Sequence, residues 1–237
     1  MMPLSGATIG AAAQIRLHPL RSIRHDEPRD RQPEGKMALA MNDKVLSDAV
    51  WQTEGTGLWV KRVALVAVGI ALLTLAAKVN VYVFPSPVPI TLGTFAVLTI
   101  GAAYGPRLGL VTMFGYLLIG ALGFDVFAGS SAEKNGISYM LRGTGGYLLG
   151  YMAAVAYLGH AAQRGLDRSV ETMAGAMLVA NALIYVPGVL WLHQFTTGWE
   201  QTMEWGFTPY IIGDLMKLTL AALILPLAWK LVGKARG

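Results

Sequence analysis

The feature of this sequence that most constrains its fold is a series of apolar stretches of membrane-crossing length. Six of them follow one another from Lys61 onward, separated by short polar segments. A helix that crosses the hydrocarbon core of a bilayer, roughly 30 Å thick, needs about 20 apolar residues. The stretches run over Lys61–Val79, Ile90–Tyr104, Leu108–Leu122, Tyr139–Ala162, Val170–His193 and Phe207–Val232. The sequence therefore predicts an all-α integral membrane protein with six transmembrane helices.

The composition of the chain agrees with a membrane environment. Of the 237 residues, 54% are hydrophobic and only 14% are charged, whereas soluble domains carry about 25% charged residues. The chain has no cysteine, which excludes disulfides and thiolate metal sites, and its four histidines lack metal-ligand spacing. We therefore expect neither a metal nor a cofactor.

The net charge of +5 is distributed as membrane topology requires. Residues 1–60 hold seven basic and seven acidic residues, so the excess lies in residues 61–237, with twelve basic and seven acidic residues. These basic residues gather at helix ends, which indicates a bilayer rather than a nucleic acid as the partner. One side collects Lys61, Arg62, Arg107, Arg164, Arg168, Lys230, Lys234 and Arg236. The positive-inside rule then predicts that both termini are cytoplasmic.

The first 60 residues differ from the rest of the chain. They are polar or weakly apolar, with charges of both signs spaced among prolines, and they contain no continuous apolar core. Such a segment buries too little apolar surface to fold by itself. We interpret residues 1–60 as a disordered cytoplasmic tail and residues 61–237 as a six-helix membrane domain. Met37 and Met41 are alternative start positions, and the sequence leaves that choice open.

The second and third stretches are short, with the sequence Gly105-Pro106-Arg107 between them. Glycine and proline together are typical of a turn, which favours a tight helical hairpin. The alternative is one long buried segment. Pro106 and Arg107 would then lie at its centre, where a proline breaks helical hydrogen bonds and a charge is costly.

The last stretch carries Gly213, Asp214 and Lys217 well inside it. A charged residue within a bilayer costs several kcal/mol, so such residues usually face a cavity, a partner or a substrate. Asp214 and Lys217 are three residues apart and share one helix face, which Tyr210 extends. An ion pair that only pins helix packing is one interpretation. A polar ligand site is the interpretation that we favour.

A further motif opens the fourth stretch. Gly145 and Gly146 would let backbone amides at a helix start approach a negatively charged ligand. Alternatively, Gly146 and Gly150 form a pair of small residues that lets two helices pack closely. Arg142 precedes these glycines, and an arginine at membrane depth is suited to hold a carboxylate.

Two other segments are predicted to be loops on the outer side. Phe84–Thr91 has three prolines at alternate positions, which favours an extended chain. Phe124–Ser131 combines aromatic and small residues.

Together these motifs resemble the BioY family, the biotin-binding S components of energy-coupling factor (ECF) vitamin importers. The resemblance covers about 170 residues, from the first stretch to the C-terminus. It rests on Val88–Thr91, Gly105–Gly109, Val126–Gly129, Thr144–Tyr147 and Gly213–Lys217, which occur in this order. The chain departs from the usual family pattern at Gly93, where glutamine is frequent, and at Asp125, where proline is common.

The resemblance implies high-affinity capture of biotin and its import across the cytoplasmic (inner) membrane of a bacterium. It also implies a six-helix S-component bundle in which the Asp-x-x-Lys motif, here Asp214 and Lys217, is needed for biotin binding. The other residues that we predict to contact the substrate are Thr91, Phe127, Arg142, Gly145, Gly146, Tyr147 and Tyr210.

In S components, small residues on the first helix dock a transmembrane coupling subunit, which carries the ATPases. Ala64, Ala67 and Ala71 lie on one face of the first stretch and are candidates for this role. The same face is equally suited to packing within the bundle.

Other function classes are less compatible with the sequence. A His-Glu-x-x-His motif, paired catalytic aspartates and a Ser/His dyad are absent, so an enzyme is not predicted. No Walker A loop is present, so ATP-driven transport needs a separate motor subunit. The remaining alternative is an S component or secondary transporter for a different vitamin-like solute.

Overall fold

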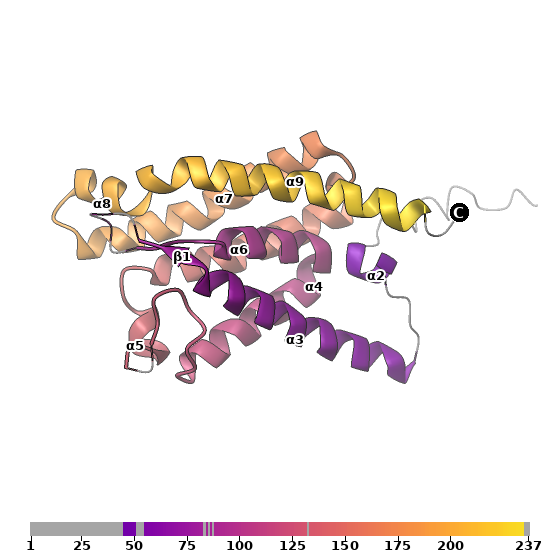
Figure 1. Ribbon diagram of the computed structural model, residues 1–237, viewed down its shortest axis with the longest axis horizontal. Coiled ribbons are helices and arrows are strands. Elements are labelled where there is room, and N and C mark those ends of the chain that lie inside the picture. Colours follow the sequence, from indigo (N-terminus) through magenta and orange to yellow (C-terminus); the bar gives the residue numbers. More distant parts are fainter. Residues whose placement is uncertain are drawn as a thin grey trace, which may run out of the picture.

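The computed structural model describes residues 45–50, 55–82, 84, 86, 88–131 and 133–234, and it is built from helices (Figure 1). Three short 3₁₀ turns, Leu166–Arg168, His193–Phe195 and Thr208–Tyr210, lie between them. The helices are α2 (Leu46–Val50), α3 (Thr56–Lys78), α4 (Gly93–Ala121), α5 (Gly136–Met140), α6 (Gly145–Gln163), α7 (Val170–Leu192), α8 (Trp199–Gly206) and α9 (Ile211–Lys234). The predicted all-α class is confirmed.

A single pair of very short strands occurs among the described residues. β1 (Asn80–Val81) and β2 (Ile90–Thr91) pair antiparallel, with Asn80 opposite Thr91. The pair brackets the proline-rich loop and fixes the entry into α4. Pro85 and Pro87 of that loop lie outside the described residues, as does most of the predicted tail. Residues 46–50 and 56–60, which the prediction placed in this tail, are helical instead, and the first long helix begins at Thr56 rather than at Lys61. The disordered state of the rest of the tail stays a prediction.

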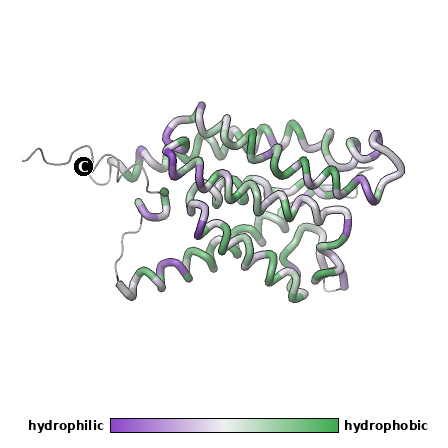
Figure 2. Tube along the Cα trace, turned by 180° about the vertical axis from the view of Figure 1, so that it is seen from behind, coloured by the Kyte–Doolittle hydropathy of each residue, from purple (hydrophilic) through white to green (hydrophobic). Residues whose placement is uncertain are grey.

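Four segments among the described residues are long and apolar enough to cross a membrane. They are Gly57–Lys78, Gly93–Ala121, Val170–Phe195 and the stretch Trp199–Gly233, which includes α8 and α9. Figure 2 shows hydrophobic residues along the length of these helices. The protein is therefore a multi-pass membrane protein. The predicted number of six crossings and the cytoplasmic position of both termini remain predictions.

α6 is the central helix of the bundle and packs between α4 and α7. Small residues make this possible, because the approach is too close for larger side chains. A Cβ atom added at Gly150 would lie 2.6 Å from the Cα atom of Ile184 in α7, and one at Gly159 would lie 2.2 Å from the backbone nitrogen of Pro106 in α4. The core follows this helix, with Ala154, Val155 and Leu158 at most 1% exposed.

α4 is broken at Gly105, which has φ 76° and ψ 176°. A positive φ is easily adopted only by glycine. The chain reverses here, since a Cβ atom added at Gly109 would lie 3.8 Å from the Cα atom of Gly101. Eight residues of straight helix would separate these positions by about 12 Å. The two halves, 93–104 and 106–121, therefore fold back on each other, as the Gly105-Pro106-Arg107 motif predicts.

The short helix α2 covers this break from the N-terminal side. The side chain of Val45 lies 2.9 Å from the position of a Cβ atom at Gly105, and Val45 is 4% exposed. Asp48 pairs with Lys61 of α3, at 3.0 Å between Oδ1 and Nζ. α2 therefore joins α3 and α4 at the end of the bundle that also carries the last turns of α9 (Figure 1).

We expect a chain that starts at Met41, and so retains α2, to have the thermal stability of the full chain. A chain that starts at residue 51 loses the burial of Val45 and Ala49. Because burying a valine side chain contributes about 1.5–3 kcal/mol, its melting temperature should fall by roughly 3–10 °C. Thermal unfolding of the three purified proteins in one detergent tests this. A lower melting temperature for the Met41 start would show that residues 1–40 contribute to stability, and equal values for all three would show that α2 does not.

Candidate functional site

A pocket opens at the end of the bundle where the β1–β2 pair, α5 and α8 gather (Figure 1). Its volume, including the open mouth, is about 800 Å³. Residues from α3, α4, α6, α7 and α9 line it, together with the loop that follows α4. The pocket thus lies where five helices converge.

A buried charged cluster forms one wall of this pocket. Asp214 lies in the first turn of α9 and is 5% exposed. The Nζ atom of Lys217 donates to Asp214 Oδ1 at 2.8 Å, and Thr94 Oγ1 donates to the same oxygen at 3.1 Å. The hydroxyl of Tyr185 donates to Asp214 Oδ2 at 2.5 Å. The carboxylate is therefore held in one orientation by donors from three helices.

This cluster retains hydrogen-bonding capacity for a ligand. An ionised carboxylate has about four acceptor positions, and the ammonium of lysine has three donors. Three of the positions on Asp214 are used. The Lys217 side chain is 13% exposed, and both residues line the pocket. Lys217 also donates to Thr94 Oγ1 at 3.4 Å. One acceptor position of Asp214 and one donor of Lys217 are thus available to a polar group in the pocket.

Thr94 and Tyr185 are the two partners of Asp214 that the sequence reasoning missed. Thr94 follows the predicted Thr91 by three residues, but Thr91 lies in β2 and α4 begins only at Gly93, so helical spacing does not connect the two. Tyr185 is a phenol in a mostly apolar helix, two residues before Pro187. A polar tip within such a helix usually has a hydrogen-bond partner, but nothing in its local sequence identifies Asp214 as that partner.

Aromatic side chains form the apolar walls. The ring of Phe127 is 1% exposed, stacks on Tyr139 at 5.5 Å between centroids, and meets Tyr116 edge-on at 5.3 Å. Tyr147 of α6 packs edge-on against Tyr185 at 6.1 Å, and its hydroxyl donates to the carbonyl of Gly206 at 2.7 Å. All five rings line the pocket. Phe127 and Tyr147, both predicted from the sequence, thus lie together at one site.

Tyr210 and Thr91 line the same pocket but also hold local structure. The hydroxyl of Tyr210 lies within hydrogen-bond distance of the carbonyls of Val88 and Trp205, at 2.5 and 3.0 Å. It also lies 2.7 Å from the hydroxyl of Ser86. Thr91 Oγ1 accepts from the backbone N–H of Gly93 at 2.9 Å, at the start of α4. The hydroxyl of Tyr210 is therefore engaged in joining the proline-rich loop to the segment before α9.

Arg142, Gly145 and Gly146 do not line the pocket. Arg142 is exposed on the turn before α6, where its carbonyl accepts from Trp191 Nε1 at 2.9 Å. A Cβ atom at Gly146 would lie 2.3 Å from the carbonyl oxygen of Pro187, and one at Gly145 would lie 2.1 Å from that of Met140. Of the two interpretations of these glycines, close packing of the backbone is the one that this geometry favours.

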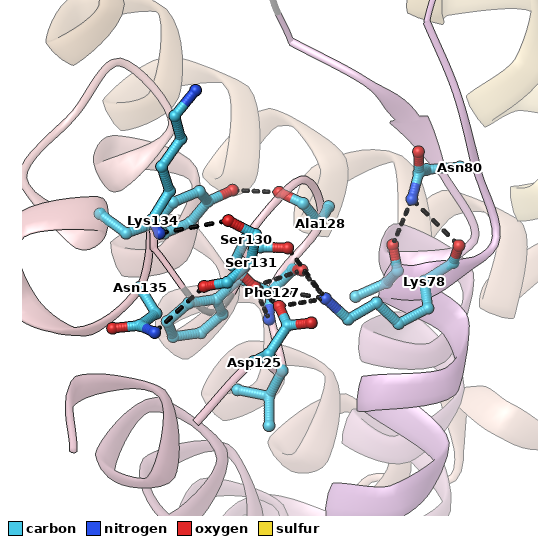
Figure 3. A network of polar contacts seen from close by, with 12 residues as sticks. Lys78, Asn80, Asp125, Phe127, Ala128, Ser130, Ser131, Lys134 and Asn135 are labelled. Carbon is cyan, nitrogen blue, oxygen red and sulfur yellow. Dashed lines mark hydrogen bonds and ion pairs between the residues drawn. The ribbon is translucent and has the colours of Figure 1, made fainter. Parts of the chain in front are cut away.

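The loop after α4 is held by a network around Lys78 (Figure 3). The Nζ atom of Lys78 contacts Asp125 Oδ1 at 2.5 Å and the carbonyl of Phe127 at 3.0 Å. The hydroxyl of Ser130 donates to Asp125 Oδ1 at 2.5 Å. Hydrogen bonds from Lys78 and Ser130 lower the pKa of the Asp125 carboxyl below its ordinary value. The role of Lys78 is not apparent from its local sequence, because its partners lie about 50 residues away.

Ala64, Ala67 and Ala71 lie on α3, away from the pocket. Ala67 and Ala71 are exposed and Ala64 is half-buried. α3 makes its main helix contact with α4, so much of its surface is free of the other helices that the structure describes. In a membrane this surface faces lipid or a partner.

The comparisons with known proteins all identify the same family. The model of the BioY family matches residues 41–234. A protein from Pyrococcus horikoshii named "Probable biotin transporter BioY" is 36% identical over 166 residues, which cover 69% of this chain and 93% of that protein. "Biotin transporter BioY" from Thermotoga maritima is 31% identical over 154 residues, which cover 65% of this chain and 87% of that protein.

The fold has a counterpart among solved structures. A crystal structure described as the S-component for biotin from an ECF-type ABC transporter matches with a TM-score of 0.67 and 19% sequence identity. The match covers 75% of this chain and 95% of that chain. The helical arrangement is therefore that of an S component. Because the family model spans most of the chain and the relatives match over nearly their whole length, this protein belongs to the BioY family.

Proposed function

We propose that this protein binds biotin as the S component of an ECF-type transporter and takes part in its import. The observation that carries the proposal is the pocket in which the Asp214–Lys217 pair faces a set of aromatic rings. The relatives are named biotin transporters, and the matched structure is an S component for biotin. The protein is thus a component of a transporter rather than an enzyme.

The chemistry of biotin fits this pocket. Its ureido group has two N–H donors and one carbonyl acceptor, its fused rings are compact and apolar, and its side chain ends in a carboxylate. Asp214 has an acceptor position for a ureido N–H, and Lys217 has a donor for a carbonyl or carboxylate oxygen. Among the described residues that line the pocket, Lys217 is the only cation. Phe127 and Tyr147 provide the apolar surface that such a ligand needs.

A ligand panel tests the proposed substrate. Tritiated biotin should bind the purified protein with high affinity, and excess thiamine or riboflavin should not displace it. A protein that binds one of those vitamins and not biotin would support the alternative, an S component or secondary transporter for a different solute. Uptake of the same labelled vitamins by cells that express the chain gives the corresponding transport measurement.

The orientation in the membrane is part of the proposal. Counting the two halves of α4 separately, together with α3, α6, α7 and α9, gives the six transmembrane segments that we propose. The end opposite the pocket carries a concentration of basic residues, which supports a cytoplasmic position of that end and of both termini. The described members of this group are Lys61, Arg62, Arg107, Arg164, Arg168 and Lys230. The pocket then opens outward, where an imported solute arrives.

The cytoplasmic (inner) membrane is the location that follows from this orientation. We propose that this membrane is bacterial. The matched relatives come from both archaea and bacteria.

We further propose that the exposed face of α3 docks an ECF coupling subunit with its ATPases. Small side chains allow close approach of membrane helices. Ala67→Trp and Ala71→Trp should leave biotin binding by the isolated protein unchanged and should strongly reduce co-purification with that subunit. Leu72→Trp, which replaces a large exposed residue on the same helix, is the matched control. Loss of biotin binding in both alanine variants would show that this face packs within the protein instead.

A further inference from the structure

Lys78 lies at the C-terminal end of α3 and makes the contacts that join this helix to the loop 124–131 (Figure 3). Its ammonium has four oxygen atoms within 3.5 Å. They are Oδ1 of Asp125 at 2.5 Å, the carbonyl of Phe127 at 3.0 Å, and the carbonyl and hydroxyl of Ser130, both at 3.4 Å. An ammonium has three donors, so this side chain is saturated by a single loop. We refer to these four residues as the Lys78 network.

The loop that Lys78 contacts forms one wall of the ligand pocket. Phe127 and Ala128 line the pocket, and so do Leu73 and Ala77 of α3 on the other side. The place where α3 meets the loop is therefore part of the pocket wall. Lys78 follows Ala77 directly, and its side chain connects the C-terminal end of α3 to the loop.

Among the described residues, the other hydrogen bonds that hold the loop come from the segments that flank it in the sequence. The hydroxyl of Tyr116, in α4, donates to the carbonyl of Val126 at 3.0 Å, and that of Tyr139, in α5, donates to the carbonyl of Ala128. These bonds fix the shape of the loop but do not attach it to α3. From the other side, Tyr82, which follows β1, approaches the loop closely. Its hydroxyl lies 2.3 Å from where a Cβ atom added at Gly129 would be. Lys78 is thus the charged link between two walls that otherwise meet through uncharged contacts such as this one.

We propose that Lys78 is a positioning residue for the ligand: through the Lys78 network it keeps the loop against α3 and the Phe127 ring in the pocket wall, and so limits ligand release. The inference rests on the proposed function, since it concerns the same pocket. Lys78 itself is not among the residues that line the pocket, and it acts through Phe127.

An exposed ion pair alone would not have this effect. The side chains of Lys78 and Asp125 are 33% and 47% exposed, and pairs of this kind contribute little because water and salt screen them. The network differs because two of the four acceptors are backbone carbonyls of the loop, one of them that of Phe127 itself. Removing the ammonium leaves these carbonyls without this donor and frees the outer side of the loop.

The first test measures release of tritiated biotin from the full-length protein in lipid nanodiscs. Lys78→Met should increase the dissociation rate constant about tenfold, the factor equivalent to losing one hydrogen bond to a charged group. Lys78→Arg, which keeps the charge and several donors, should stay within about twofold of the wild type. Asp125→Asn should have a smaller effect, and the double variant should be no faster than Lys78→Met alone, because both residues act through one network.

Lys134→Met is the matched control, because it removes the same charge from an exposed side chain just beyond the same loop. It should release biotin at the wild-type rate. A wild-type protein that does not bind biotin would contradict the proposed function. A wild-type protein that binds it, with equal release rates for the wild type and for Lys78→Met, would overturn the role of Lys78.

The second test needs no ligand and uses the absence of cysteine from the chain. Val126→Cys places a thiol in the loop at a position that is 8% exposed. Reaction with a maleimide should be at least about tenfold faster when Lys78→Met is added, since the loop then opens more often. Val155→Cys, in the core of α6 and 1% exposed, should stay unreactive in both backgrounds.

The two thiol positions separate opening of the loop from general unfolding. Faster labelling at position 126 alone supports the proposal. Faster labelling at both positions would mean that Lys78→Met unfolds the bundle, and the positioning role would be wrong. Unchanged labelling at position 126 would overturn it as well.

Discussion

Asp214→Asn and Lys217→Ala are each expected to weaken biotin binding by about 100-fold or more, while the protein still inserts into the membrane. The two side chains are 6% and 13% exposed and lie 2.8 Å apart. In the proposed complex each side chain also hydrogen-bonds a polar group of biotin, and truncating one partner of a buried, hydrogen-bonded charged contact between protein and ligand costs about 2–5 kcal/mol in binding. Equilibrium binding of tritiated biotin to the purified variants measures this loss. Near-normal affinity in both variants would contradict the site assignment.

Some loss of stability should accompany both changes. Asp214 also accepts from Thr94 and Tyr185, so its conversion to asparagine disturbs bonds to α4 and α7. A thermal unfolding curve for each variant separates this effect from the loss of a ligand contact. Tyr185→Phe is a useful third variant, because it removes one donor to Asp214 and keeps the ring. It should weaken binding by less than Asp214→Asn.

Arg142→Ala tests which cation serves the carboxylate of biotin. Because Arg142 is exposed and does not line the pocket, we expect unchanged affinity for biotin and for a derivative whose carboxylate is amidated. If Arg142 holds the carboxylate, as the sequence reading allowed, the variant will bind biotin more weakly and the amidated derivative with unchanged affinity. Equal losses for both ligands would indicate a structural role for Arg142.

Gly146→Ala is expected to destabilise the bundle without a direct effect on the ligand. The added Cβ atom would lie 2.3 Å both from the carbonyl oxygen of Pro187 and from the Cβ atom of Trp191. Backbone atoms of α7 must then move, and overpacking of this kind costs about 1–3 kcal/mol. For a protein of this size, the melting temperature should fall by roughly 3–10 °C.

Gly175→Ala is the matched control, because no atom lies within 4 Å of its added Cβ atom. Alanine is favoured over glycine inside a helix by about 0.5–1 kcal/mol, so this variant should be unchanged or slightly more stable. If Gly146→Ala weakens biotin binding at an unchanged melting temperature, the glycine brings its backbone to a ligand and does not serve helix packing. Thermal unfolding and biotin binding on the same samples distinguish the two interpretations.

The part of the site on α9 was predictable because it is local in the sequence. Asp214 and Lys217 are three residues apart in one helix, so helical geometry alone places them on one face. Placing these charges within a bilayer costs free energy, which indicates that they have a function. The Gly105-Pro106-Arg107 turn was predictable for the same reason, since the φ value of 76° at Gly105 is a requirement on a single residue.

Contacts between distant segments could not be derived in this way. Thr94 lies 120 residues before Asp214, and Tyr185 lies 29 residues before it. Neither spacing follows from a helical period. Arg142 was assigned to the site because it precedes two glycines, but the turn before α6 leaves its side chain exposed.

By itself, the sequence determined the membrane environment, the helical class, the turn at Gly105, the family resemblance and the acid–base pair on the last helix. These properties depend on the hydropathy of single segments and on spacings within one helix. Only the tertiary structure decided that Thr94 and Tyr185 orient Asp214, that Gly146 faces Pro187, and that Lys78 joins α3 to the loop of Phe127. The physical reason is that such contacts depend on how whole helices cross and rotate against each other, and small residues in several helices together set that packing.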